Sequence, residues 1–238
     1  MGLSGAQKGR VMRTAAHLAL LFSISFCAQA NAQECNDSAF MKVADRYLLR
    51  TVGAVGSDDP VIQAGAARTC DEWTFDTFAS WGPAGGTAIE LDFSGYYTRE
   101  VGPFTVQLAA AYYLVNLGDS LFDASDDIVE VYADVSLPLS GERLTVAPLL
   151  RVGELIGVDD LPSLTMIQPG VRASYRITDR LTASGEYRAS MNLTQDYTTH
   201  QFAGALAWQA SERTAFRLGW EDTARTPSAT SLGVYHNF

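Results

Sequence analysis

The sequence lacks several features that would assign it to a common class of protein. It has no stretch of about 20 consecutive apolar residues, so no segment is expected to form a transmembrane helix. Its 27 Asp and Glu outnumber its 17 Lys and Arg, and we therefore expect no nucleic-acid partner. It has no phosphate-cradling glycine loop and no zinc-ligand constellation, so we expect no cofactor and no metal.

The N-terminus has the layout of a secretory signal peptide. Three Lys and Arg side chains precede a short apolar core at residues 18–26, and small residues follow at 30–32. We expect cleavage near Ala32, which leaves 14 Lys and Arg against 27 Asp and Glu, a net charge of −13. Cys27 offers a lipoprotein signal as an alternative, but the residues before it are a poor context for lipid attachment.

Residues 33–70 form an N-terminal segment with two cysteines, Cys35 and Cys70. In an oxidising compartment this pair predicts a disulfide that closes a loop of about 36 residues. The apolar residues of 38–51 recur at helical spacing, which predicts one short helix. The segment is either tied down by the disulfide or acts as a plug that enters the domain that follows.

From residue 71 to Phe238 the pattern changes to a period of two, which is typical of strands. Between 128 and 139, for example, Val129, Val131, Ala133 and Val135 alternate with more polar side chains. The pattern predicts ten strands, at about 73–81, 87–98, 104–116, 128–139, 143–155, 164–177, 180–191, 199–209, 213–221 and 230–238.

Charge is sorted between the two faces of these strands. We expect the more apolar face to carry no Asp, Glu, Lys or Arg, and the opposite face to carry balanced acids and arginines. A membrane barrel turns its charged face to the lumen and its apolar face to lipid, so we predict a lumen closed by ion pairs. The expected inward residues are Asp76, Glu90, Asp92, Glu130, Asp134, Glu186, Arg151, Arg172, Arg176, Arg188, Arg213 and Arg217.

Connection lengths and turn positions predict the topology. Tight turns at 100–102, 140–142, 178–180 and 210–212 alternate with longer links, as short periplasmic turns alternate with external loops. An even number of strands then puts both termini in the periplasm. A three-residue turn at 178–180 would place Arg172 opposite Glu186, and a turn at 210–212 would place Trp208 opposite Thr214.

The last eight residues resemble the C-terminal signal of bacterial outer-membrane barrels. Ser231, Gly233 and the terminal Phe238 fit that signal, whereas His236 stands where a hydrophobic residue is usual. The chain thus resembles the small outer-membrane β-barrel proteins, including the opacity-type and porin-like barrels. The resemblance implies an outer-membrane location, contact with outer-membrane lipid and lipopolysaccharide, and recognition by the barrel-assembly machinery through Gly233 and Phe238.

We therefore expect an all-β protein, an antiparallel up-and-down transmembrane β-barrel of about ten strands over 71–238, with eight as the alternative count. The leading functional hypothesis is a barrel with an ion-paired lumen and a structural or surface-recognition role through external loops. The alternatives are a narrow channel for small solutes, a lipid-acting enzyme, and a soluble periplasmic barrel that binds an apolar ligand. Only weak catalytic candidates exist, His200 with Asp222 opposite it, so we do not expect an enzyme.

Overall fold

The computed structural model describes residues 35–49, 54–82, 88–115, 127–158 and 162–238. The predicted signal peptide, including Cys27, lies outside the described residues. Within the described ranges, no helix is long and apolar enough to cross a membrane.

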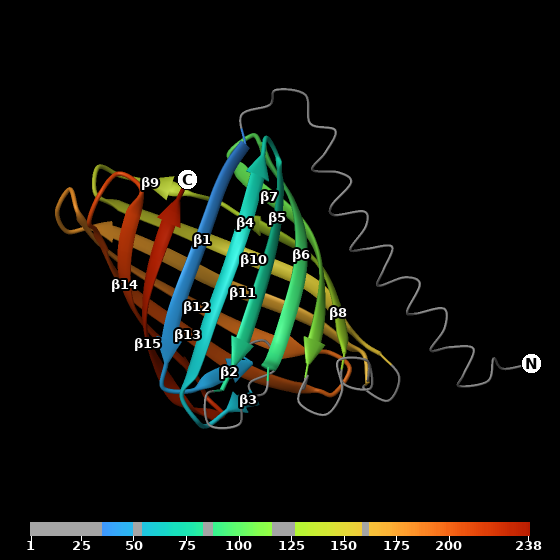
Figure 1. The fold of residues 1–238 in the computed structure, drawn as a ribbon. Coiled ribbons are helices and arrows are strands. Elements are labelled where there is room, and N and C mark those ends of the chain that lie inside the picture. The colour runs from blue at the N-terminus through green and yellow to red at the C-terminus, as the bar shows by residue number, and fades with distance from the viewer. Residues whose placement is uncertain (1–34, 50–53, 83–87, 116–126, 159–161) are drawn as a thin grey trace, which may run out of the picture. The chain divides into compact units, whose positions relative to one another are not determined.

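Twelve antiparallel strands close into a β-barrel (Figure 1). They are β1 (Cys35–Ala44), β4 (Val61–Cys70), β5 (Trp73–Trp81), β6 (Ala88–Val101), β7 (Phe104–Val115), β8 (Ile128–Ser136), β10 (Leu144–Gly157), β11 (Leu164–Arg176), β12 (Leu181–Asn192), β13 (Tyr197–Gln209), β14 (Thr214–Thr223) and β15 (Thr226–Asn237). The short β9 (Leu139–Ser140) continues β8 along β10. Pairing of β1 with β15 and of β10 with β11 completes the ring.

All ten predicted strands are present, but the count of ten is wrong because the barrel begins at residue 35. The short helix predicted for 38–51 is also wrong: β1 and then β2 (Tyr47–Leu49) occupy it, and no helix occurs among the described residues. In β1, Met41 and Val43 are exposed on the outside. Phe40 points inward, where it stacks on Tyr235 with the ring centroids 5.3 Å apart. Because apolar residues occupy both faces, their spacing imitates that of a helix.

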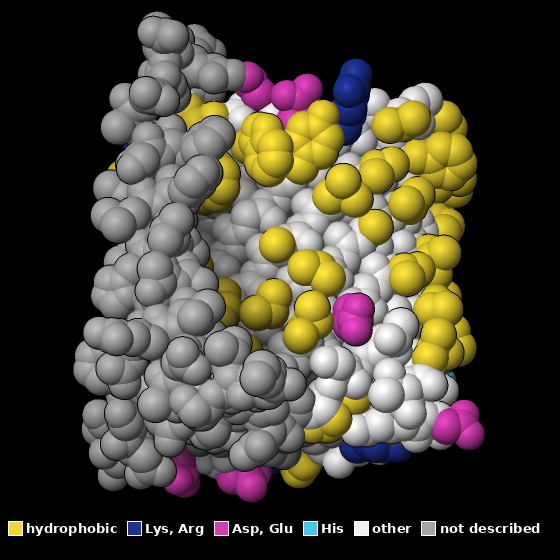
Figure 2. Space-filling view, turned by 90° about the vertical axis from the view of Figure 1, so that its right-hand side faces the viewer, with side chains coloured by type: hydrophobic (Ala, Val, Ile, Leu, Met, Phe, Trp, Pro, Cys, Tyr) yellow, Lys and Arg dark blue, Asp and Glu magenta, His cyan; other side chains and the backbone are white. Residues whose placement is uncertain are grey.

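The outer face of the barrel is apolar, as a lipid-facing surface requires. Exposed large side chains on it include Leu108, Val152, Phe202, Leu218 and Leu232. Figure 2 shows hydrophobic side chains spread over the described outer surface, with most charged side chains toward its two ends. The expectation that this face carries no charge is wrong at Glu154, which follows Val152 in the same alternation and is exposed.

The two ends of the barrel differ in their connections. The start of β1, the end of β15 and the tight turns, such as those after β6, β11 and β13, lie at one end, here termed the short-turn end. The longer links lie at the opposite, long-loop end, where the connection between β1 and β4 forms a separate hairpin of β2 and β3 (Ala54–Ser57).

Strand register follows the turns. Arg172 pairs with Glu186 as predicted, because the turn at 178–180 has three residues. The second prediction is wrong by two residues: Trp208 pairs with Phe216, not Thr214. The three-residue turn here is 211–213, and the hydroxyl of Ser211 accepts hydrogen bonds from the amides of Arg213 (3.3 Å) and Thr214 (3.1 Å).

The chain ends on the seam between the first and last strands. Gly233 lies opposite Lys42, and a Cβ at Gly233 would lie only 2.7 Å from the Cβ of Lys42. The amide of Phe238 donates to the carbonyl of Asp37 at 2.9 Å, while its ring stays exposed. A glycine at position 233 is therefore required for close pairing of β15 with β1.

The predicted disulfide between Cys35 and Cys70 is confirmed. It constrains the unfolded chain by closing the loop that holds β1, the hairpin and β4. We expect replacement of both cysteines by serine to lower the free energy of unfolding by about 4 kcal/mol on the chain-entropy estimate.

Urea unfolding of the detergent-refolded protein checks this expectation, with and without a reducing agent. The unmodified protein under reducing conditions should match the double serine variant. Equal midpoints for the oxidised and reduced proteins would show that the disulfide does not stabilise the barrel.

Candidate solute passage in the barrel interior

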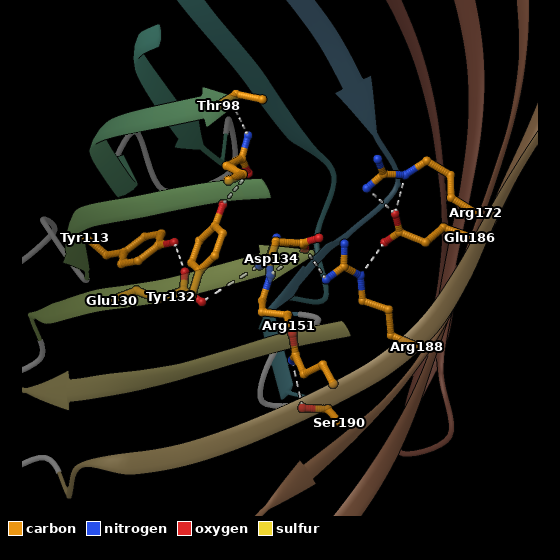
Figure 3. A network of polar contacts seen from close by, with 12 residues as sticks. Thr98, Tyr113, Glu130, Tyr132, Asp134, Arg151, Arg172, Glu186, Arg188 and Ser190 are labelled. Atoms are coloured by element: carbon orange, nitrogen blue, oxygen red, sulfur yellow. Dashed lines mark hydrogen bonds and ion pairs between the residues drawn. The ribbon is translucent and has the colours of Figure 1, made fainter. Parts of the chain in front are cut away.

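A chain of ion pairs crosses four neighbouring strands of the inner wall (Figure 3). Arg172 binds Glu186 at 2.8 Å, and Glu186 also binds Arg188 at 2.9 Å. Asp134 then binds both Arg188 and Arg151, each at 3.2 Å. We call this set, together with Glu130 at 4.0 Å from Arg151, the interior network. It connects β8, β10, β11 and β12 through charges that are buried or half-buried except for Arg172, which is exposed.

Aromatic and amide side chains extend the interior network toward β6. The guanidinium of Arg151 lies over the ring of Tyr132, 3.7 Å from its centroid. Tyr132 donates to Gln107 at 3.4 Å, and Gln107 donates to Thr98 at 3.1 Å. Tyr113 donates to Glu130. Contacts of one connected set therefore run from β6 to β12, and they hold the arginines in fixed positions.

Two glycines make room for this set on the wall. A Cβ at Gly170 would lie 2.4 Å from the carbonyl oxygen of Tyr187 and 3.0 Å from Cγ of Arg188. A Cβ at Gly153 would lie 2.7 Å from Cβ of Tyr132. Because both positions lack a side chain, Arg188 and Tyr132 can lie close to the backbone.

The β2–β3 hairpin contacts the interior at the long-loop end. Tyr47 on β2 donates a hydrogen bond to Glu90 on β6, and Leu48 is 4% exposed. Beside the hairpin is a cavity of about 240 Å³, here termed the hairpin cavity. Its lining includes Lys42, Arg46, Glu90, Asp92 and Glu221. The N-terminal segment thus contacts the lumen wall through a β-hairpin and not through the predicted helix.

The structure does not bring all predicted lumen residues into one network. Glu90 and Asp92 line the hairpin cavity. Arg217 lies near Tyr235, with 5.8 Å between its guanidinium and the ring centroid. Arg176 donates to the carbonyl of Glu142 at 2.8 Å, at the short-turn end. Among the described residues, no group of three or more His, Cys, Asp or Glu side chains could hold a metal ion.

The weak catalytic pair is not assembled. Asp222 lies opposite Phe202, and His200 lies opposite Ala189. The error follows from the turn at 211–213, which shifts β14 by two residues against β13. Nδ1 of His200 instead lies 2.8 Å from the hydroxyl of Tyr187, so among the described residues it contacts a phenol and not a carboxylate.

Sequence reasoning missed the residues of the hairpin cavity that come from β1 and the hairpin. Lys42 and Arg46 were not predicted as inward-facing residues because the pattern of their segment indicates a helix. Gln63 on β4 was missed because no strand was predicted between the expected helix and residue 73, although Gln63 is buried and donates to Ser80 at 3.2 Å. The usable signal was an alternation in which the polar Ser38 and Lys42 share one face, with the apolar Phe40 between them. Ala39 and Met41 lie on the other face.

No protein-family model matches the sequence, and no curated protein matches it. Solved structures are similar in fold. The KdgM porin, solved in complex with disordered oligogalacturonate, superposes with a TM-score of 0.59 at 9% identity, over 85% of this chain and 99% of that one. The NanC porin gives 0.58 at 9% identity, over 84% and 98%. The β domain of the Bordetella autotransporter BrkA gives 0.51 at 10% identity, over 86% and 100%.

Proposed function

Because this chain is an outer-membrane β-barrel, we propose that it is a narrow channel for small hydrophilic solutes. The observation that carries the proposal is a polar, charged interior inside twelve strands. Side chains just fill a barrel of about eight strands, so twelve strands enclose more space than side chains of ordinary size occupy. The similarity in fold to two porins supports the same class of function.

Two cavities support a continuous route through this interior. The hairpin cavity reaches Glu221 on β14. A second cavity of about 160 Å³ also reaches Glu221, and its lining includes Arg172, Glu186 and Arg217. A solute that enters beside the hairpin would therefore pass Glu221 and then the exposed side of the interior network. Acids and arginines both line this route, so we expect weak preference for either sign of charge.

Single-channel recording tests the proposal. We expect the detergent-refolded protein without residues 1–32 to give discrete, reproducible current steps in a planar bilayer. Absence of steps from protein shown by its heat-dependent gel migration to be folded and inserted would overturn the channel. The interior network, which ties four strands of the wall together, favours the second candidate in that case: a closed barrel with a structural or surface-recognition role.

A further inference from the structure

Two charged side chains in the hairpin cavity have buried atoms without partners. Asp92 is 7% exposed, and its Oδ1 has no hydrogen-bond partner among the described residues. In the same part of the chain, Nε and Nη1 of Arg46 are buried and likewise lack partners. A buried polar atom without a hydrogen bond is costly, so these atoms require a partner that the described residues do not supply.

Both groups line one cavity: Arg46 is a cation, and Asp92 shares a hydrogen bond with Glu90, so these two carboxyl groups hold one proton and one negative charge between them. Arg46 offers hydrogen-bond donors, while Oδ1 of Asp92 is an acceptor. They are not within ion-pair distance, as the ion pairs found among the described residues do not include them. Both line a cavity of about 240 Å³, which holds far more than the single water molecule, at about 30 Å³, that could bridge two polar groups.

The other charges of the cavity are already engaged. Lys42 and Glu221 both have interaction partners. Glu90 accepts the hydrogen bond of Tyr47. Phe78 and Tyr47 add an aromatic wall, with their ring centroids 6.2 Å apart. A ligand therefore meets one cation with unpaired donors, one unpaired carboxyl oxygen on the hydrogen-bonded pair of Glu90 and Asp92, and an apolar surface.

We propose that the hairpin cavity binds a small zwitterionic solute of the amino-acid type. Its carboxylate accepts hydrogen bonds from Arg46, and its ammonium group donates to Oδ1 of Asp92. A solute with only one charge leaves the other protein group unpaired, and a site built around buried polar groups discriminates strongly against such an analogue. The proposal rests on the proposed channel, because the cavity lies on the route of entry.

Calorimetry of the refolded barrel in detergent tests the site without any current. The probes are L-alanine, propionate, which is alanine without its amino group, and ethylamine, which is alanine without its carboxylate. We expect alanine to bind at least about tenfold more tightly than either analogue, because each analogue forfeits a charged hydrogen bond. Absence of heat with alanine, or equal affinity for the three probes, would overturn the proposal.

Two variants assign the binding to the named side chains. Arg46→Gln and Asp92→Asn should each weaken alanine binding by about tenfold. Arg46→Gln should leave ethylamine binding unchanged, and Asp92→Asn should leave propionate binding unchanged. The matched controls are Arg99→Gln and Asp71→Asn, which lie at the short-turn end, away from the hairpin cavity. Variants that fold, by gel migration, and bind alanine like the unmodified protein would contradict the assignment.

The experiments test the channel and the zwitterion site independently. Alanine binding without current steps would leave the site in place and remove the channel. Current steps without alanine binding would leave the channel in place and remove the zwitterion site.

Discussion

Removal of the β2–β3 hairpin should raise the single-channel conductance several-fold. The hairpin reaches the lumen wall through Tyr47 and Glu90 and narrows the long-loop end of the route. Because β1 and β4 are neighbours in the barrel, a short Gly-Ser turn can replace residues 46–59 without breaking the ring. Planar-bilayer recording of the two proteins at the same salt concentration measures the effect.

A matched pair of tyrosine variants serves as the control for this result. Tyr47→Phe removes the hydrogen bond to Glu90 and should give more frequent transitions between current levels. Tyr112→Phe removes a hydrogen bond of 2.6 Å to Asp127, away from the hairpin, and should leave the current trace unchanged. Equal conductance with and without the hairpin would show that another part of the lumen limits the current.

Replacement of Arg188 by alanine should lower the free energy of unfolding by about 3 kcal/mol. Arg188 is the central cation of the interior network, with a side chain that is 6% exposed. It binds Asp134 and Glu186 at once. Its removal leaves buried carboxylates with fewer partners, and an uncompensated buried charge is costly. Urea unfolding of the refolded barrel in lipid vesicles measures the loss.

Arg172→Ala is the matched control, because Arg172 also binds Glu186 but is exposed to the lumen. Its side chain is 56% exposed, so we expect a loss of at most about 1 kcal/mol. A comparable loss for the two variants would indicate that water reaches Arg188 as freely as Arg172, and that the network does not stabilise the wall.

The ten strands from Trp73 onward could be predicted because lipid on one side and charge on the other enforce alternation. The first two strands of the barrel, β1 and β4, could not be predicted from this alternation. In β4, the outward residues Ala64 and Ala66 and the inward residues Gly65 and Ala67 are all small, so the two faces look alike in the sequence. Gly65 lies under Phe40, whose ring a Cβ would meet at 2.5 Å, which explains the glycine at this position.

The candidate site was predictable only between adjacent strands. The pair of Arg172 and Glu186 follows from the length of one turn. The contact between Arg188 and Asp134 joins strands that are not neighbours, and only the curvature of the closed wall brings it about. The bond from Tyr47 to Glu90 depends on where the hairpin lies, which no alternation pattern encodes.

Pairing of β1 with β15 makes the chain nearly circular. Phe40 lies opposite Tyr235, and the amide of Phe238 reaches the carbonyl of Asp37, so the two ends of the barrel sequence are already in contact. A short linker could join them, and new ends could be opened at the turn between β11 and β12. The order of strands around the ring would stay the same while their order in synthesis changed. Such circular permutants separate the contribution of the seam to stability from its place at the end of the chain.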